Sequence, residues 1–285
     1  MLDDSTQLHF PDSGRVELPF EFNPAILRCA AVGPGGHPLM VLLDTGTDPS
    51  AIDLELARQL GLRLGDFGLG QSAISNTVPF TETVIPWLRL GDLTLRNLFA
   101  LALNLRASPF QVDLVLGYNV LRHMVLHIDY TRRQLQLSHT DLSRPASHPD
   151  AIVFDLCFYD HFPALSQMVK CDSLLLPLVT IDTGSNGSLT LSPDLADSLG
   201  LHSQADAVTT EQGDGFASRS YDVVCRPVDV VQLGPLTLRD VLVDTPGPGM
   251  GNLQQAGRAN IGNRLLAQFS SVTVDYARKQ CTIRL

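Results

Sequence analysis

Basic residues and long apolar runs are scarce in this chain of 285 residues. Lysine and arginine together number 20 against 30 acidic residues, which gives a net charge of −10. A nucleic-acid partner requires a basic stripe, so this balance argues against one. No apolar run approaches the roughly 18 residues of a membrane span, and Met1–Asp4 lacks the basic start of a signal peptide. We therefore expect no membrane contact and a cytoplasmic location, or a periplasmic or secreted one if a signal segment has been trimmed.

Cysteine is also sparse, with five residues and no Cys-x-x-Cys pair. An odd, scattered set is typical of buried thiols in a reducing compartment, although one bridge within the second half stays open. His123 and His127 are four residues apart, as two metal ligands on one helix face would be. His127 lies in a strand-like apolar run, however, and this argues against a metal site. The sequence predicts neither a metal nor another cofactor.

The chain does contain one tripeptide twice, as Asp44-Thr45-Gly46 and as Asp182-Thr183-Gly184. Each copy follows an apolar run and precedes a hydroxyl residue. A buried strand that ends in a tight turn can hold a carboxylate rigidly, and two such strands can hold two carboxylates face to face. Two carboxylates in contact cannot both ionise, so they share one proton. A single copy would predict only a strand-ending turn.

Matching landmarks follow both tripeptides in the same order. They pair Leu56–Leu62 with Leu195–Leu201, Leu90–Asn97 with Leu233–Asp240, Val115–Leu121 with Asn260–Leu266, and Ile128–Tyr130 with Val274–Tyr276. The separation grows slowly, from 138 residues (182 minus 44) to 146 residues (275 minus 129). Ordered self-similarity of this kind indicates an internal duplication. We expect an N-terminal lobe over 1–140, a linker rich in Ser, His, Pro and Asp over 141–150, and a C-terminal lobe over 151–285.

Short apolar segments separated by turn residues predict a mostly β protein with brief helices. One helix should follow each tripeptide, with Ser50 and Ser192 as N-caps and Gly61 and Gly200 as the ends. Each half should then close with a second short helix and a hairpin. The expected ranges are Asn119–His123 and Asn263–Gln268 for the helices, and Val125–Tyr130 with Gln134–Leu137 and Ser271–Tyr276 with Gln280–Leu285 for the hairpins.

Paired carboxylates suit peptide hydrolysis by an activated water, because one accepts a proton while the other donates one. Thr45 and Thr183 can cross-link the two loops through hydroxyl-to-backbone hydrogen bonds. The glycines lack a Cβ and allow the loops to approach closely. Thr47 and Ser185 can donate to the outer carboxylate oxygens, which helps to keep one of them ionised.

These motifs resemble the pepsin and retropepsin superfamily of aspartic peptidases. Its signature is Asp-Thr-Gly followed by Ser or Thr, and later two hydrophobic residues, a Gly, and a Leu or Ile four positions beyond it. The first half fits fully with Val115–Gly117 and Leu121, whereas Asn260 replaces one hydrophobic residue in the second. The resemblance covers nearly the whole chain. It implies a bilobal, mostly β fold with a cleft between pseudo-symmetric lobes, and catalysis by Asp44 and Asp182.

The chain also departs from pepsins, because its lobes are short and more like two fused retropepsin units. Pepsin-like enzymes carry a flap tyrosine in the first lobe, but no tyrosine occurs between Thr47 and Gly117. Glycine-bearing segments are the flap candidates in its place. They are Phe67–Gln71, with Gly68 and Gly70, and Gln212–Phe216, with Gly213 and Gly215.

We therefore predict an aspartic endopeptidase that acts on peptides or proteins as a monomer. One alternative is a peptidase-fold module that binds peptides without cutting them. Another is a dimer in which each aspartate pairs with its own copy in a second chain. Two complementary lobes on one chain favour the intrachain pair, because it costs less entropy.

Overall fold

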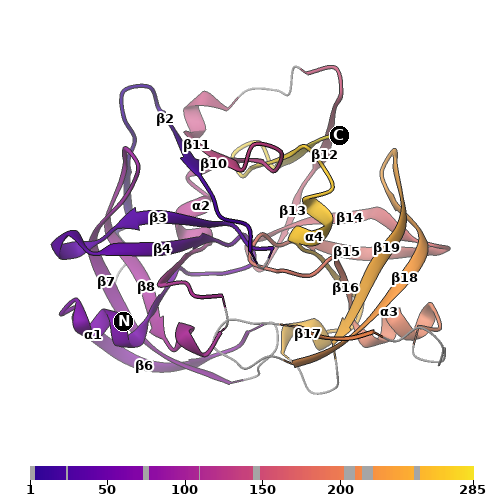
Figure 1. Cartoon of the computed structure of the whole chain (residues 1–285), viewed down its shortest axis with the longest axis horizontal. Coiled ribbons are helices and arrows are strands. Elements are labelled where there is room, and N and C mark those ends of the chain that lie inside the picture. The colour runs from indigo at the N-terminus through magenta and orange to yellow at the C-terminus, as the bar shows by residue number, and fades with distance from the viewer. Residues whose placement is uncertain are drawn as a thin grey trace.

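Two lobes lie side by side and are joined by a shared sheet in the computed structural model of the chain (Figure 1). The structure describes residues 4–23, 25–72, 77–108, 110–143, 148–201, 209–213, 221–246 and 251–285. The fold is mostly β, with short helices and pseudo-symmetric lobes, as the sequence predicts.

Each lobe is built on an eight-stranded sheet. The first comprises β1 (Gln7–His9), β3 (Arg28–Val32), β4 (Pro38–Leu43), β5 (Ala51–Asp53), β6 (Leu64–Gly70), β7 (Val78–Leu90), β8 (Leu93–Leu103) and β9 (Leu114–Leu116). The second comprises β13 (Cys157–Tyr159), β14 (Phe162–Cys171), β15 (Leu174–Ile181), β16 (Leu189–Leu191), β17 (Thr209–Gly213), β18 (Tyr221–Leu233), β19 (Leu236–Pro246) and β20 (Arg258–Ile261).

The strand order relates the two lobes. In the first sheet β4, β9, β5 and β8 are consecutive neighbours, and in the second β15, β20, β16 and β19 follow the same pattern. The β4–β9 and β15–β20 pairs are both parallel. Because β4 and β15 run directly into the two Asp-Thr-Gly tripeptides, both tripeptides leave their sheets at equivalent positions.

A six-stranded sheet joins the lobes and draws strands from both halves of the sequence. It comprises β2 (Arg15–Pro19), β10 (Met124–Asp129), β11 (Gln134–His139), β12 (Ala151–Asp155), β21 (Ser271–Asp275) and β22 (Gln280–Arg284). The predicted hairpins are β10–β11 and β21–β22. Strands β10 and β21 pair antiparallel about the central residues His127 and Thr273. Equivalent strands of the two lobes therefore meet at a pseudo-twofold axis.

The helices are short and lie close to the expected positions: α1 (Leu54–Gln59), α2 (Tyr118–Leu121), α3 (Pro193–Ser198) and α4 (Asn263–Leu266). The 3-10 turns of the described residues are η1 (Pro34–Gly36), η2 (Leu105–Ala107), η3 (Thr140–Leu142) and η4 (Asn252–Gln254). Gly61 and Gly200 follow α1 and α3 with the positive φ angles that glycine accommodates best.

One predicted cap is wrong. Asp53, and not Ser50, caps α1, because its carboxylate accepts a hydrogen bond from the amide of Leu56 at 3.0 Å. The Ser50 hydroxyl instead donates to Asn119 Oδ1 at 2.7 Å. A buried amide from a distant helix thus competes successfully for the serine. Ser192 precedes α3 as predicted, with Pro193 as its first residue.

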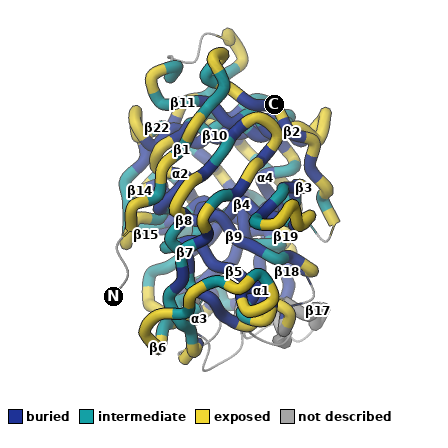
Figure 2. Tube along the Cα trace, turned by 90° about the vertical axis from the view of Figure 1, so that its left-hand side faces the viewer, coloured by how far each residue is buried: buried dark blue, intermediate teal, exposed yellow. Residues whose placement is uncertain are grey.

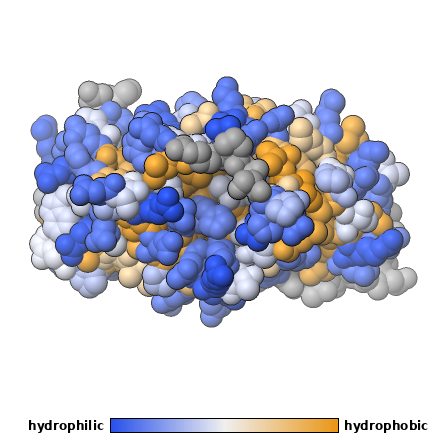
Figure 3. Space-filling view, turned by 90° about the horizontal axis from the view of Figure 1, so that it is seen from above, coloured by the Kyte–Doolittle hydropathy of each residue, from blue (hydrophilic) through white to orange (hydrophobic). Residues whose placement is uncertain are grey.

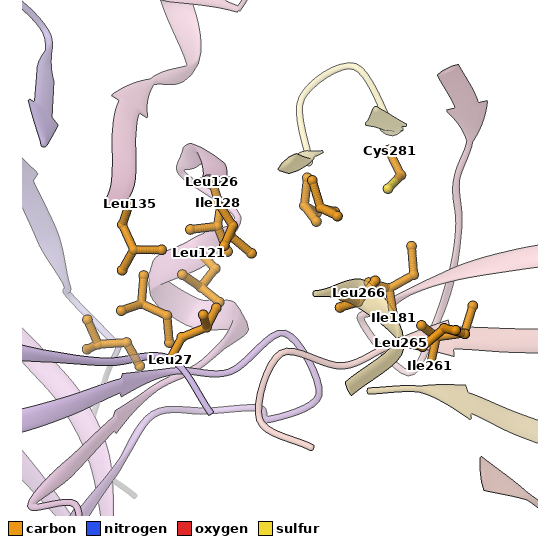
Figure 4. Packing of buried hydrophobic residues seen from close by; sticks show 14 of the residues in the cluster. Leu27, Leu121, Leu126, Ile128, Leu135, Ile181, Ile261, Leu265, Leu266 and Cys281 are labelled. Atoms are coloured by element: carbon orange, nitrogen blue, oxygen red, sulfur yellow. The ribbon is translucent and has the colours of Figure 1, made fainter. Parts of the chain in front are cut away.

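Apolar residues fill both lobes and the space beneath the central sheet. Dark blue marks buried residues along β4, β5 and β9 in Figure 2, while the outer turns are exposed. In the close-up, Leu121 of α2 lies in the core of the first lobe and Leu266 of α4 in that of the second (Figure 4). All five cysteines are free thiols, so the bridge left open for the second half is not formed.

The surface seen from above is largely hydrophilic, with smaller apolar patches between the polar residues (Figure 3). No helix in the described ranges is both long and apolar enough to span a membrane. The linker expected over 141–150 lies between β11 and β12, and residues 144–147 are outside the described part. The division at this segment stays a prediction, because the six-stranded sheet mixes strands from both sides of it.

Candidate active site

Two equivalent loops carry Asp44 and Asp182 to the junction of the lobes. The amide of Asp44 donates to the carbonyl of Leu116 in β9, and the amide of Asp182 donates to that of Ile261 in β20. The distances from nitrogen to oxygen are 3.0 and 2.9 Å. Each aspartate is thus held by the last residue of the parallel strand beside its own.

The threonines of the two tripeptides lock these loops together. The Thr45 hydroxyl donates to the carbonyl of Ile181 at 2.6 Å, and the Thr183 hydroxyl donates to that of Leu43 at 2.7 Å. Each hydroxyl also accepts from the backbone amide of the other threonine, at 3.0 and 3.1 Å. Both threonines are fully buried. The cross-link expected from the residue types is present, and it fixes the separation of the two aspartates.

Glycine is required at this junction because each loop presses against the opposite aspartate. A Cβ on Gly46 would lie 2.6 Å from Cγ of Asp182, and one on Gly184 would be closer still to Cγ of Asp44. Real side chains do not make such contacts, so any larger residue would displace the opposite aspartate or its loop.

The two carboxyl groups lie close enough for the side chain of each to act on the pKa of the other. Asp44 Oδ1 accepts from the amide of Gly46 at 2.7 Å, and its Oδ2 accepts from the Thr47 hydroxyl at 2.6 Å. Asp182 Oδ1 accepts from the amides of Gly184 and Ser185 at 2.8 and 3.1 Å. Such hydrogen bonds favour the ionised form and oppose the cost of burial.

Burial dominates the electrostatics of this pair. Burial, and then the negative charge of Asp182, raises the pKa of Asp44 well above its usual range. Burial also raises the pKa of Asp182, but hydrogen bonds from Asp44, Gly184 and Asn260 oppose that rise. Two coupled carboxyl groups in this environment hold one proton between them over a range of pH.

Comparison with known proteins bears on the fold and on the sequence of the first lobe. Residues 30–120, which contain Asp44 and the Val115–Gly117 landmark, match the aspartyl protease family. The structure of basic 7S globulin from soybean superimposes with a TM-score of 0.58 over 95% of this chain and 94% of that one, at 12% sequence identity. No curated protein matches the sequence.

The chain has a pepsin-like fold. The resemblance seen in the motifs is therefore confirmed for the architecture, and at the level of sequence for the first lobe.

Within this pepsin-like frame the second lobe departs from the prediction at Ser185. Its hydroxyl was expected to donate to Asp182, but the bond it makes is as an acceptor from the amide of Gly187 at 3.2 Å. Asn260 Nδ2 donates to Asp182 Oδ2 at 3.1 Å and so takes the place that Thr47 has beside Asp44. The sequence signal for this residue was its polar character at a position where the pepsin-like signature is hydrophobic.

Residues outside the tripeptides buttress the loops. Tyr130, from the end of the first-lobe hairpin, donates through its hydroxyl to Asn263 Oδ1 at 2.8 Å. Asn263 Nδ2 donates in turn to the carbonyls of Thr183 and Ser185 at 2.7 and 3.2 Å. A residue of the first lobe thus supports the loop of the second. These tyrosine and asparagine contacts were not identified from the sequence.

Tyr276 is the second-lobe counterpart of Tyr130, and its surroundings differ. Its buried hydroxyl has no hydrogen-bond partner in the described part of the chain. Burial, followed by the charge of Asp44, raises the pKa of Tyr276 far above its usual range. The ring packs edge-on against Tyr118 with centroids 5.9 Å apart. Tyr276 is therefore a neutral phenol close to Asp44 and Asp182.

The flap candidates of the first lobe lie on the arm of a hairpin and not at its tip. Gly68 and Gly70 belong to β6, which pairs with β7. The connection runs from 71 to 77, and 73–76 are outside the described residues. At its start, the carbonyl of Ser72 accepts from the amide of Asn252 in the second lobe at 3.1 Å. In that lobe Gly213 ends β17, and Gly215 is outside the described residues.

The two histidines whose spacing raised the possibility of a metal site have different partners. His127 Nδ1 is 2.7 Å from the Thr273 hydroxyl within the six-stranded sheet. His123 Nε2 accepts from Arg122 Nε at 3.0 Å. In the described ranges no three His, Cys, Asp or Glu side chains are grouped as metal ligands.

Proposed function

We propose that the chain is an aspartic endopeptidase that hydrolyses peptide bonds with Asp44 and Asp182 as its catalytic dyad. The observation that supports this most directly is the pair of carboxyl groups, Asp44 buried and Asp182 partly buried, that act on each other's pKa at the junction of two loops cross-linked by threonines. A carboxylate beside a carboxylic acid supplies both a general base and a general acid in one site.

In the proposed reaction a water molecule lies against both carboxyl groups. The ionised aspartate takes a proton from the water while the oxygen of that water attacks the peptide carbonyl carbon. The protonated aspartate gives its proton to the carbonyl oxygen, and a neutral tetrahedral diol results. Transfer of a proton to the peptide nitrogen then breaks the carbon–nitrogen bond, releasing a carboxyl group and an amine. No covalent intermediate with the protein forms.

We also propose that one chain suffices and that the active form is a monomer. The two aspartates of a single chain already pair, and their threonines cross-link the loops without a second copy. A dimer that paired Asp44 with its own equivalent would have to break this network. Sedimentation at several concentrations tests the monomer, and a concentration-dependent dimer that is required for cleavage would contradict it.

Incubation with a mixed peptide library from acid to neutral pH tests the peptidase directly. We expect cleavage with a bell-shaped dependence on pH, because one carboxyl group must be ionised and the other protonated. Asp44→Asn should abolish cleavage. Asp92→Asn, in the exposed turn between β7 and β8, is the matched control and should leave it unchanged. Cleavage that survives Asp44→Asn would refute the dyad.

The alternative is a pepsin-like module that holds a peptide without cutting it. The absence of a tyrosine from the whole of β6 and β7 favours this reading, since pepsin-like enzymes carry one on the flap. The similar solved structure is also named as a globulin, and no enzyme activity is part of that name. Peptide binding without cleavage at any pH would support this alternative over the peptidase.

A further inference from the structure

The two halves of the dyad are supported asymmetrically. Among the described residues, Asp44 accepts two hydrogen bonds, from the amide of Gly46 and the hydroxyl of Thr47. In the same part of the chain Asp182 accepts three, from two backbone amides and from Asn260 Nδ2. The side chain of Asn260 is the one donor in this set that reaches its aspartate from a neighbouring strand, 78 residues along the chain.

The orientation of Asn260 is set by a partner on the adjacent strand. The Thr180 hydroxyl donates to Asn260 Oδ1 at 2.7 Å. With Oδ1 engaged in this way, Nδ2 is left to face Asp182. Asn260 is 5% exposed, so water offers its amide little alternative. A buried amide with a preset direction donates to a carboxylate more effectively than a mobile one, because less order is lost when the bond forms.

The first lobe has an apolar pair at the equivalent place. Thr180 lies opposite Asn260 in the parallel pairing of β15 and β20, and Leu42 lies opposite Val115 in that of β4 and β9. Leu42 and Val115 are buried and belong to a hydrophobic cluster of the first lobe. They offer Asp44 no donor. The polar pair is therefore a feature of the second lobe alone.

We propose that Asn260 is a positioning residue that keeps Asp182 as the ionised member of the dyad and leaves the shared proton on Asp44. The proposal rests on the proposed peptidase function and adds an order of roles to it. Asp182 takes the proton from the attacking water, and Asp44 delivers its proton to the peptide carbonyl oxygen. The protons balance, since Asp182 ends this step protonated and Asp44 ends it ionised. In the second step, when the carbon–nitrogen bond breaks, Asp182 gives up its proton and Asp44 takes one back.

Other ionisable groups surround the dyad and must be distinguished from Asn260 in any test. Tyr276 lies close to Asp44 and stays neutral. Asp48 follows the first loop, and its carboxylate is 2.7 Å from His161 Nδ1 of the second lobe. Asp244 lies beneath the second loop and accepts from the amide of Ser188 at 2.8 Å. Asn260 is neutral, so replacing it with another neutral residue neither adds nor removes a charge near these groups.

The decisive variant is Asn260→Val, which copies the first lobe. Removing a donor to a carboxylate makes its ionisation harder, so the acid limb of the kcat/KM profile should move to higher pH by about one unit, or ~1.4 kcal/mol. Thr180→Val should move the acid limb in the same direction but by a smaller amount, because Asn260 remains and loses only the hydrogen bond from Thr180 that orients it. Thr273→Val is the matched control, since it deletes a partly buried threonine hydrogen bond in the six-stranded sheet and should leave the profile unchanged.

A second measurement reads the order of ionisation without any need for cleavage. With the aspartate carboxyl carbons labelled with ¹³C, NMR titration should show Asp182 ionising at lower pH than Asp44, and Asn260→Val should narrow the gap. Asp44 ionising first would overturn the proposal, as would an acid limb that moves no further in Asn260→Val than in Thr273→Val. If Asn260→Val fails to fold, Thr180→Val and the titration of the unaltered protein decide. If the protein cleaves no peptide, the proposed peptidase function is refuted, and the NMR titration still tests whether Asn260 keeps Asp182 ionised.

Discussion

Replacing Thr183 with valine should be strongly destabilising although it changes the side-chain volume little. The hydroxyl of Thr183 donates to the carbonyl of Leu43 and accepts from the amide of Thr45, and all of this is buried. Valine fills the same space but leaves both backbone groups without a partner. Each buried unpaired group costs about 1–3 kcal/mol, so the loss of both partners should lower the free energy of unfolding by roughly 2–6 kcal/mol. That is a large share of the ~5–15 kcal/mol by which folded proteins are stable.

Urea denaturation measures this loss. The single tryptophan, Trp87, lies in β7 and reports on the first lobe, while far-UV circular dichroism reports on both. The matched control is Thr183→Ser, which keeps the hydroxyl and loses one methyl group, at a cost of about 1 kcal/mol. If Thr183→Val were no less stable than Thr183→Ser, the cross-link would contribute nothing to stability. The reasoning that derives the rigidity of the dyad from it would then be refuted.

Two other predictions concern the same loops. The pKa of Asp44 is raised in the folded state, so the folded protein keeps a proton that the unfolded chain releases. The contribution of this group to stability is therefore lost as pH rises from about 4 toward the raised pKa. The side chain of Asn in Asp44→Asn does not ionise, so the stability of this variant relative to the unaltered protein should improve between pH 4 and pH 7, by about 1.4 kcal/mol per unit by which the pKa is raised. If the difference in urea midpoint between the two proteins were the same at both pH values, this prediction would be wrong. Gly46→Ala should cost ~1–3 kcal/mol or more, because its Cβ would lie 2.6 Å from Asp182 Cγ. Gly70→Ala, whose nearest neighbour would be 3.5 Å away, should unfold at nearly the unaltered temperature, and equal melting points for the two variants would count against the close approach.

Much of the architecture was readable from local patterns. Apolar runs that end in Asp-Thr-Gly predicted strands that deliver two aspartates, and alternating residues in the closing hairpins predicted β10–β11 and β21–β22. Repeated landmarks predicted the equivalence of the lobes, and the strand order agrees with it. These features depend on residues close together in the chain, whose preferences act without regard to the rest of the fold. The internal duplication itself, as a history, stays a prediction.

Other features depended on partners that no local pattern names. Ser50 has the residue type of an N-cap, but Asn119, 69 residues away, takes its hydroxyl, and Asp53 caps α1. Gly68 and Gly70 resemble a loop tip, yet pairing with β7 extends β6 through both of them. In each case a contact distant in sequence outweighed a weak local preference, as tertiary contacts commonly do.

The same distinction applies to the dyad. The chain's residue order alone established which two aspartates would meet, because each stands at the end of a strand in a repeated unit. Packing between strands determined how each aspartate is supported. The Ser185 hydroxyl turns toward Gly187, and Asn260 reaches Asp182 because β15 and β20 pair in parallel with Thr180 alongside. A hydrogen bond depends on distance and direction in space, and neither is encoded by a residue's type or its place in a motif.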